Sequence, residues 1–142
     1  LEVGSDCPFF IDPVPSFATG RGEMLKPVDY LPQEYKLVLV NPGIRISTRD
    51  AYNNCIPGMP VKSLEELFRL PPSEWNGSVI NDFEQYVFKL YPEIEAIKNS
   101  LYSAGALYSS MSGSGSTVYG IFRDIGEIPR YIRDYVVFEG DL

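Results

Sequence analysis

The sequence predicts an α+β fold in which helices cover one face of an antiparallel sheet. Residues 35–40 form a nearly continuous apolar run, two further apolar runs flank a Gly/Ser-rich segment at 110–117, and another lies at 136–138. Segments whose apolar residues recur at helical spacing, each with a capping residue, follow the run 35–40. A shorter segment of this kind precedes the run 136–138. Over residues 35–142 these elements assemble as a ferredoxin-like split β-α-β sandwich with insertions.

The composition of the 142-residue chain limits its functions. The hydrophobic fraction of 44% suffices for a buried core, in one domain or in one domain plus a fragment. Acidic residues outnumber basic ones by 19 to 12, which disfavours a nucleic-acid partner because phosphate backbones bind basic surfaces. Runs of about 18 apolar residues are lacking, so no membrane partner is expected. Residues 1–4 lack the basic and apolar regions of a signal peptide.

The sequence contains no histidine and two cysteines, Cys7 and Cys55. The lack of histidine excludes Ser-His-Asp triads, Cys-His dyads and His metal sites, so acid–base chemistry would need Asp, Glu, Lys or Tyr. The wide spacing of the cysteines favours neither a zinc site nor a disulfide framework. Reduced thiols in a cytoplasmic protein are the simplest interpretation.

Residues 1–34 are rich in proline, glycine and turn residues and have too little amphipathic pattern for a core. They resemble the closing part of a structure that begins upstream. Phe9, Phe10 and Phe17 are expected to expose apolar surface, which favours a homo-oligomer. The segment 20–23, Gly-Arg-Gly-Glu, suits a phosphate clamp built on Arg21 or a tight hairpin, and the hairpin is favoured.

The first elements of the larger part have clear start and stop signals. The apolar run 35–40 predicts a buried, central strand that ends at Asn41-Pro42-Gly43. A short helix is expected at 48–54, capped by Ser47 or Thr48. Ser63 to Glu66 has the form of a capping box, and prolines at 71 and 72 should end the helix that it begins.

The segment 81–84, Asn-Asp-Phe-Glu, repeats the capping pattern and predicts a helix with Ile80, Phe83, Val87 and Leu90 on one face. Pro92 suits the first turn of a further helix. Ile94, Ile97 and Leu101 share a face of this helix, and Gly105 suits its C-terminal cap.

The Gly/Ser segment connects two expected strands, 106–108 and 118–122. Its glycines permit positive φ, and successive N–H groups in such a turn can form an anion-binding concavity. A flexible hairpin loop explains the pattern about equally well. Asp124 and Glu127 predict the start of a last helix with Ile128 and Ile132, and 136–138 predicts the closing strand.

Three more positions have a functional and a purely structural interpretation. Asp6 suits a general base held beside backbone N–H groups, although a simple helix cap is more common. Tyr52 suits stacking on a nucleobase or ordinary packing. Asn81 and Asp82 suit a metal or hydroxyl ligand, but capping explains them fully.

The order of four motifs resembles the GHMP small-molecule kinases. The motifs are Gly-Ser-Asp-Cys-Pro-Phe-Phe-Ile at 4–11, Ala-Thr-Gly-Arg-Gly-Glu at 18–23, Asn-Asp-Phe-Glu at 81–84 and Met-Ser-Gly-Ser-Gly-Ser at 111–116. The resemblance covers essentially all 142 residues. It is strongest to members that phosphorylate a cytidylyl-linked methylerythritol in non-mevalonate isoprenoid biosynthesis.

The resemblance implies a role for each matching residue. Asp6 matches the catalytic aspartate that polarises or deprotonates the substrate alcohol. The stretch 112–116 (Ser112, Gly113, Ser114, Gly115 and Ser116) matches the C-terminal Gly-rich motif, which supports the nucleotide-phosphate loop. Tyr52 matches an aromatic residue that stacks on cytosine. Asn53 stands where some relatives have lysine, so substrate contacts there are expected to differ.

The resemblance also implies ATP as co-substrate, with Mg²⁺ to neutralise its triphosphate. The family's N-terminal phosphate loop and catalytic lysine have no counterpart in these residues. Residues 1–34 therefore match the end of an N-terminal kinase domain and 35–142 a C-terminal domain, and we expect the chain alone to be inactive. Two alternatives stay open: a non-catalytic module that binds a ligand or partner, and a GHMP kinase for homoserine, mevalonate or a sugar.

Overall fold

The computed structural model describes residues 10–11, 14–28, 34–58 and 61–142. The chain divides into two compact units, residues 1–33 and 34–142. In the first unit, β1 (Ser16–Thr19) pairs antiparallel with β2 (Met24–Pro27). The turn between them contains Gly20 at φ 71° and Gly22 at φ 103°. This turn is the tight hairpin that the Gly-Arg-Gly-Glu pattern favoured.

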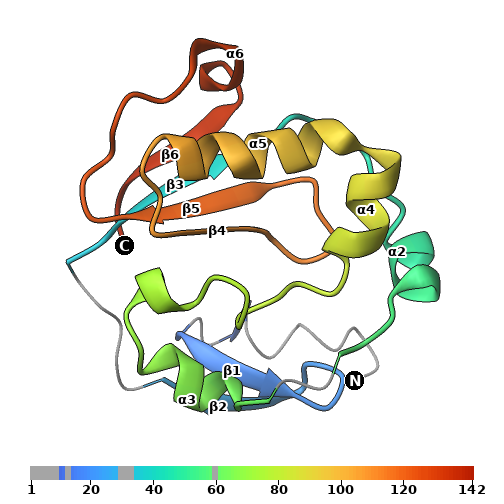
Figure 1. The fold of residues 1–142 in the computed structure, drawn as a ribbon. Helices are drawn as coiled ribbons and strands as arrows, with labels where there is room; N and C mark the ends of the chain where they lie inside the picture. The colour runs from blue at the N-terminus through green and yellow to red at the C-terminus, as the bar shows by residue number, and fades with distance from the viewer. Residues whose placement is uncertain (1–9, 12–13, 29–33, 59–60) are drawn as a thin grey trace. The chain divides into compact units, whose positions relative to one another are not determined.

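The second unit is built on a four-stranded antiparallel sheet in the order β4-β5-β3-β6 (Figure 1). Its strands are β3 (Lys36–Val40), β4 (Tyr108–Met111), β5 (Val118–Phe122) and β6 (Val136–Asp141). With the helices between β3 and β4 and between β5 and β6, this order is that of the predicted ferredoxin-like sandwich. The prediction that 35–40 forms a central strand is confirmed, because β3 lies between β5 and β6.

The helices of this unit follow their start signals with two exceptions. They are α2 (Thr48–Asn54), α3 (Leu64–Phe68), the 3₁₀ turn η1 (Pro72–Glu74), α4 (Glu84–Leu90), α5 (Pro92–Ser103) and α6 (Arg130–Arg133). Ser47 caps α2 through the backbone N–H of Asp50, and both bonds of the Ser63 capping box are present at α3. None of the helices in the described residues has the length and apolar character for a membrane span.

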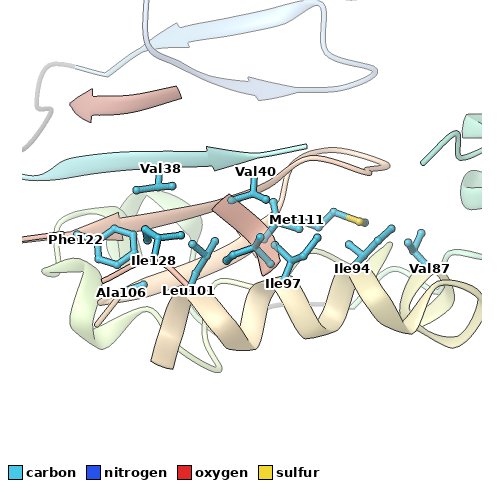
Figure 2. Packing of buried hydrophobic residues seen from close by; sticks show 12 residues of the cluster. Val38, Val40, Val87, Ile94, Ile97, Leu101, Ala106, Met111, Phe122 and Ile128 are labelled. Carbon is cyan, nitrogen blue, oxygen red and sulfur yellow. The ribbon is translucent and has the colours of Figure 1, made fainter. Parts of the chain in front are cut away.

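The main core lies between the sheet and α5, which runs across one face of it (Figures 1 and 2). Ile94, Ile97 and Leu101 of α5 point toward the sheet, as their spacing predicted, and are at most 4% exposed. Val38 and Val40 meet them from β3. Because alternate residues of a strand face opposite sides, the same pattern leaves the other face of β3 to Leu37 and Leu39.

The opposite face of the sheet carries a second cluster that the sequence interpretation did not predict. Trp75, which follows η1, packs with Tyr35, Tyr108 and Ile121. Its ring stacks on Phe68 at 5.2 Å, and its indole N–H donates to the Leu70 carbonyl at 2.9 Å. The insertion between α2 and α4 therefore covers part of the sheet face opposite α5.

The last helix is shorter than predicted. α6 begins at Arg130 rather than near Asp124, although Ile128 and Ile132 are buried as expected. The reason is Pro129, because a proline disfavours helical geometry in the residue before it. Pro129 itself is extended, with φ −53° and ψ 137°.

Candidate functional site

The Gly/Ser loop is an ordered connection between β4 and β5. It spans residues 112–117, because β4 extends through Ser110 and Met111 rather than ending at 108 as predicted. The Ser112 N–H donates to the Thr117 carbonyl at 2.8 Å, and the Gly115 N–H donates to the Ser112 carbonyl at 3.0 Å. Ser116 is buried, whereas Ser112 and Gly113 are exposed. The loop thus presents exposed backbone at one end and is anchored at the other.

The backbone of this loop requires glycine at Gly115. Its φ is 91°, and a Cβ there would lie 2.6 Å from Ile46 Cδ1 and 2.7 Å from Met111 Sδ. Gly113 also has positive φ, 56°, but a Cβ would meet nothing within 4 Å. The loop is therefore packed against Ile46 at its second glycine and leaves space at its first.

Helix α2 lies beside the loop. Thr48, its first residue, contacts Ser114 through their hydroxyl oxygens at 3.3 Å. One turn later, Tyr52 is 67% exposed and packs edge-on against the Phe83 ring at 4.9 Å. Asn53 is exposed. The structure thus brings α2, which carries Tyr52 and Asn53, next to the Gly/Ser loop.

A hollow of about 500 Å³ adjoins the first residues of the loop. Phe83, the ring that contacts Tyr52, lines it, and so do Ser112 and Gly113 of the loop. The strands contribute Tyr108 and Tyr119 to its wall. One continuous region therefore joins the aromatic pair, the hollow and the loop.

The two tyrosines of the hollow are poor acid–base groups. Burial raises the pKa of Tyr108 far above its ordinary value, and burial also raises the pKa of Tyr119. The Tyr108 hydroxyl donates to the Val79 carbonyl at 3.0 Å. Both phenols are therefore neutral near pH 7 and serve to shape the wall.

The sequence interpretation missed the roles of Asn81 and Glu84. The expected capping box is wrong, because α4 begins only at Glu84 and its N-cap residue, Phe83, makes no side-chain bond. Asn81 instead donates to the carbonyls of Met111 and Gly113, and the Glu84 carboxylate accepts from the Met111 N–H.

The predicted apolar face of this helix is also only partly correct. Val87 is fully buried, but Ile80 is 66% and Leu90 53% exposed. Glu84 lies three residues before Val87, on the same face of the helix. The only sign of a buried polar contact in the sequence was therefore Glu84, a carboxylate on the apolar face of this helix.

The comparison with protein families agrees with this arrangement. The model of the family described as "GHMP kinases C terminal" matches residues 57–136, more than half of the chain. The chain belongs to the GHMP kinase family. The match includes α4, α5, the Gly/Ser loop and both strands that flank it.

Individual GHMP kinases extend the comparison to nearly the whole chain. The chain is 48% identical over 136 residues to a 4-diphosphocytidyl-2-C-methyl-D-erythritol kinase of Parabacteroides distasonis, covering 96% of the chain and 49% of the relative. It is 52% identical over 120 residues to the kinase of that name from Bacteroides fragilis, covering 84% of the chain and 44% of the relative. The chain therefore spans about half the length of these curated relatives.

A solved structure shows the same architecture. The crystal structure of a 4-(cytidine 5′-diphospho)-2C-methyl-D-erythritol kinase superposes with a TM-score of 0.70 at 27% identity. It covers 99% of this chain, and the chain covers 54% of it. The predicted α+β fold of a GHMP kinase C-terminal domain is confirmed.

Two further predicted features of this GHMP kinase chain belong to the first unit, residues 1–33. Asp6, the expected catalytic residue, lies outside the described residues. The segment 20–23 forms the β1–β2 turn, where the Glu23 carboxylate accepts the Arg21 backbone N–H at 2.6 Å. Hydrogen bonds from the backbone N–H groups of Glu23 itself and of Arg21 lower the pKa of the Glu23 carboxyl. Within the described turn, this hydrogen bond and the positive φ of Gly20 and Gly22 account for the Gly-Arg-Gly-Glu pattern without a phosphate.

The described residues do not form a metal centre of their own. Within the ranges that the structure covers, no three His, Cys, Asp or Glu side chains gather closely enough to hold an ion. Asn81 already uses its side-chain N–H groups and oxygen in three hydrogen bonds. Asp82 accepts the Gly58 N–H at 3.2 Å.

Proposed function

We propose that this chain forms the C-terminal part of an ATP-dependent kinase that phosphorylates a hydroxyl of 4-diphosphocytidyl-2-C-methyl-D-erythritol. The observation that carries the proposal is the contact between Thr48 and Ser114, which holds the helix of Tyr52 beside the Gly/Ser loop. An aromatic face for a nucleobase and a glycine-rich wall for the loop that holds the phosphates are thereby adjacent. The relatives at 48% and 52% identity support the choice of substrate.

In the proposed reaction, the alcohol oxygen attacks the γ-phosphorus of ATP, the bond from that phosphorus to the bridging oxygen breaks, and ADP leaves. Asp6 accepts the proton of the alcohol or orients its hydroxyl. Residues 112–116 form the wall that supports the loop holding the triphosphate. Tyr52 stacks on the cytosine, and Asn53 provides a polar contact beside it. Such a transfer depends on positioning and electrostatics, so it needs no histidine.

The proposal includes Mg²⁺ bound to the ATP phosphates, where it would offset their charge. Glu84, whose carboxylate is bonded at the residue before the loop, does not fit the role of its ligand, because it is occupied by Ser110, Met111 and Lys98. We therefore assign no step to the ion. A cytoplasmic location belongs to the proposal as well, supported by cysteine usage alone.

The test is an assay of what we call the completed kinase. It is this chain fused behind the part of the Parabacteroides distasonis relative that the chain does not match. ADP release and ³¹P spectra are recorded with the cytidylyl-linked alcohol, with homoserine and with mevalonate. We expect a new phosphate ester only on the cytidylyl-linked alcohol. Phosphorylation of homoserine or mevalonate with equal efficiency would contradict the proposed substrate.

A further inference from the structure

Strand β4 lies at an edge of the sheet, yet side chains bond its free side. β4 pairs with β5 alone among the described strands, but all four of its residues are buried. The Tyr102 hydroxyl donates to the Ser109 carbonyl at 3.2 Å, and the Met111 N–H and carbonyl both bond to side chains. An edge strand normally leaves such groups to water or to another strand.

Glu84 bonds this edge where the strand passes into the Gly/Ser loop. Its Oε1 accepts the Ser110 hydroxyl at 2.9 Å and the Met111 N–H at 2.8 Å. Its Oε2 lies 2.5 Å from Lys98 Nζ of α5. Glu84 is only 8% exposed, and a buried carboxylate is stable when a cation and hydrogen-bond donors surround it in this way. The contact therefore ties α4 and α5 to the end of β4.

Asn81 bonds the next stretch of backbone. Its Nδ2 donates to the Met111 carbonyl and to the Gly113 carbonyl, both at 2.8 Å, so it spans the first residues of the loop. Its Oδ1 accepts the Phe83 N–H at 3.0 Å. Both ends of the amide are engaged. An aspartate could keep the bond to Phe83 but could not donate to the two carbonyls.

The segment that carries these two residues also carries Phe83. Phe83 lines the hollow and meets the Tyr52 ring, whereas Asn81 and Glu84 bond the loop and the strand before it. Four consecutive residues thus contact both the proposed cytosine side and the proposed phosphate side of the site. Because these residues lie in one short segment, the segment fixes the position of the proposed cytosine side relative to the proposed phosphate side.

We infer that Asn81 and Glu84 are positioning residues that hold the Gly/Ser loop in the shape required beside the nucleotide phosphates. Neither residue needs to touch a substrate. The inference rests on the proposed function for its catalytic consequence, while the hold on the loop is a property of this chain alone. The experiment therefore has one arm on the 142-residue chain and one on the completed kinase.

The first arm measures amide hydrogen exchange of the loop in the chain itself. Asn81→Asp keeps the bond to Phe83 and removes both donors to the loop, so we expect Ser112 and Gly115 to exchange about tenfold faster or more, relative to the slowest core amides. Glu84→Gln should give a smaller acceleration, because the amide oxygen still accepts the Met111 N–H. Asn99→Asp and Glu93→Gln, at exposed positions of α5, make the same charge changes and should leave the loop unaffected.

The second arm compares Michaelis constants in the completed kinase. Asn81→Asp should raise the KM for ATP about tenfold and change the KM for the cytidylyl-linked alcohol less than about twofold. The inference would be overturned if Asn81→Asp left both the amide exchange of the loop and the KM for ATP as in the unmodified protein. Equal increases in both KM values would overturn it as well. An inactive completed kinase would count against the proposed function, whereas the exchange arm would still decide whether Asn81 holds the loop.

Discussion

At the scale of single residues, the loop is most sensitive at its second glycine. Gly115→Ala places a Cβ at positive φ and within 2.7 Å of two side chains, so we expect the free energy of unfolding to fall by about 2–3 kcal/mol. Gly113→Ala meets no neighbour within 4 Å and should cost about 1 kcal/mol, from its φ alone. Urea unfolding of both variants measures the difference. Equal losses would show that Ile46 and Met111 do not confine the loop.

Tyr52 gives a second prediction at this scale. Stacking on a base contributes about 1–3 kcal/mol, so Tyr52→Ala in the completed kinase should raise the KM for the cytidylyl-linked alcohol about tenfold or more. Tyr52→Phe preserves the ring, so its KM for the cytidylyl-linked alcohol should stay close to that of the unmodified kinase. If Tyr52→Ala raises the KM for an alcohol that lacks cytosine by the same factor, stacking on the base is not the role of Tyr52.

The residues of the site differ in how far the sequence could predict them. Ser47 and Ser63 bond to backbone three residues away, so local patterns were sufficient. Asn81 and Glu84 bond to residues 26 to 32 positions later, and only the folded sheet brings them together. Their resemblance to a capping box was misleading for this reason. Tyr52 and the Gly/Ser loop were predicted, but their proximity was not.

At the scale of elements, the capping box of α3 gives a pH prediction. Hydrogen bonds from the Ser63 backbone N–H and hydroxyl lower the pKa of Glu66 below its ordinary value of 4.5. Because the folded-state pKa is the lower one, this stabilisation is present above about pH 4.5 and is lost as the pH falls through the folded value. We expect Glu66→Gln to lower the free energy of unfolding at neutral pH and to have little effect once the carboxylate is protonated.

Urea unfolding at neutral pH and at about pH 3 measures that difference. Glu127→Gln removes an exposed carboxylate outside α3 and should show no comparable pH dependence. A Glu66→Gln effect that is the same at both pH values would show that the charge of Glu66 does not contribute.

The elements themselves were predictable where one strong pattern acts. The apolar spacing of α5, Pro92 at its start and Gly105 after its end gave the observed helix, with Gly105 at φ 97°. The predicted start of α6 was wrong, because Pro129 disfavours helical geometry in the residues before it although Asp124 and Glu127 are acidic residues typical of a helix start. The cover of the second sheet face depends on Trp75 and Phe68, whose stacking joins residues of an irregular insertion. No periodic pattern marks such a contact.

At the scale of the whole molecule, strand order was predictable because few topologies bury the observed apolar runs. The chain's division into units 1–33 and 34–142 is a property of the fold. The assignment of these units to the two domains of a kinase stays a prediction, as does the inactivity of the chain alone.

The central proposal is that Asp6 is the carboxylate that polarises or deprotonates the substrate alcohol, and one substitution tests it most directly. We compare turnover of the cytidylyl-linked alcohol by the completed kinase with and without Asp6→Asn. Loss of a positioned general base costs about 10²–10⁴ in rate, so we expect kcat to fall by at least about 10²-fold with the affinity for both substrates preserved. An Asp6→Asn enzyme that keeps its kcat would contradict the account.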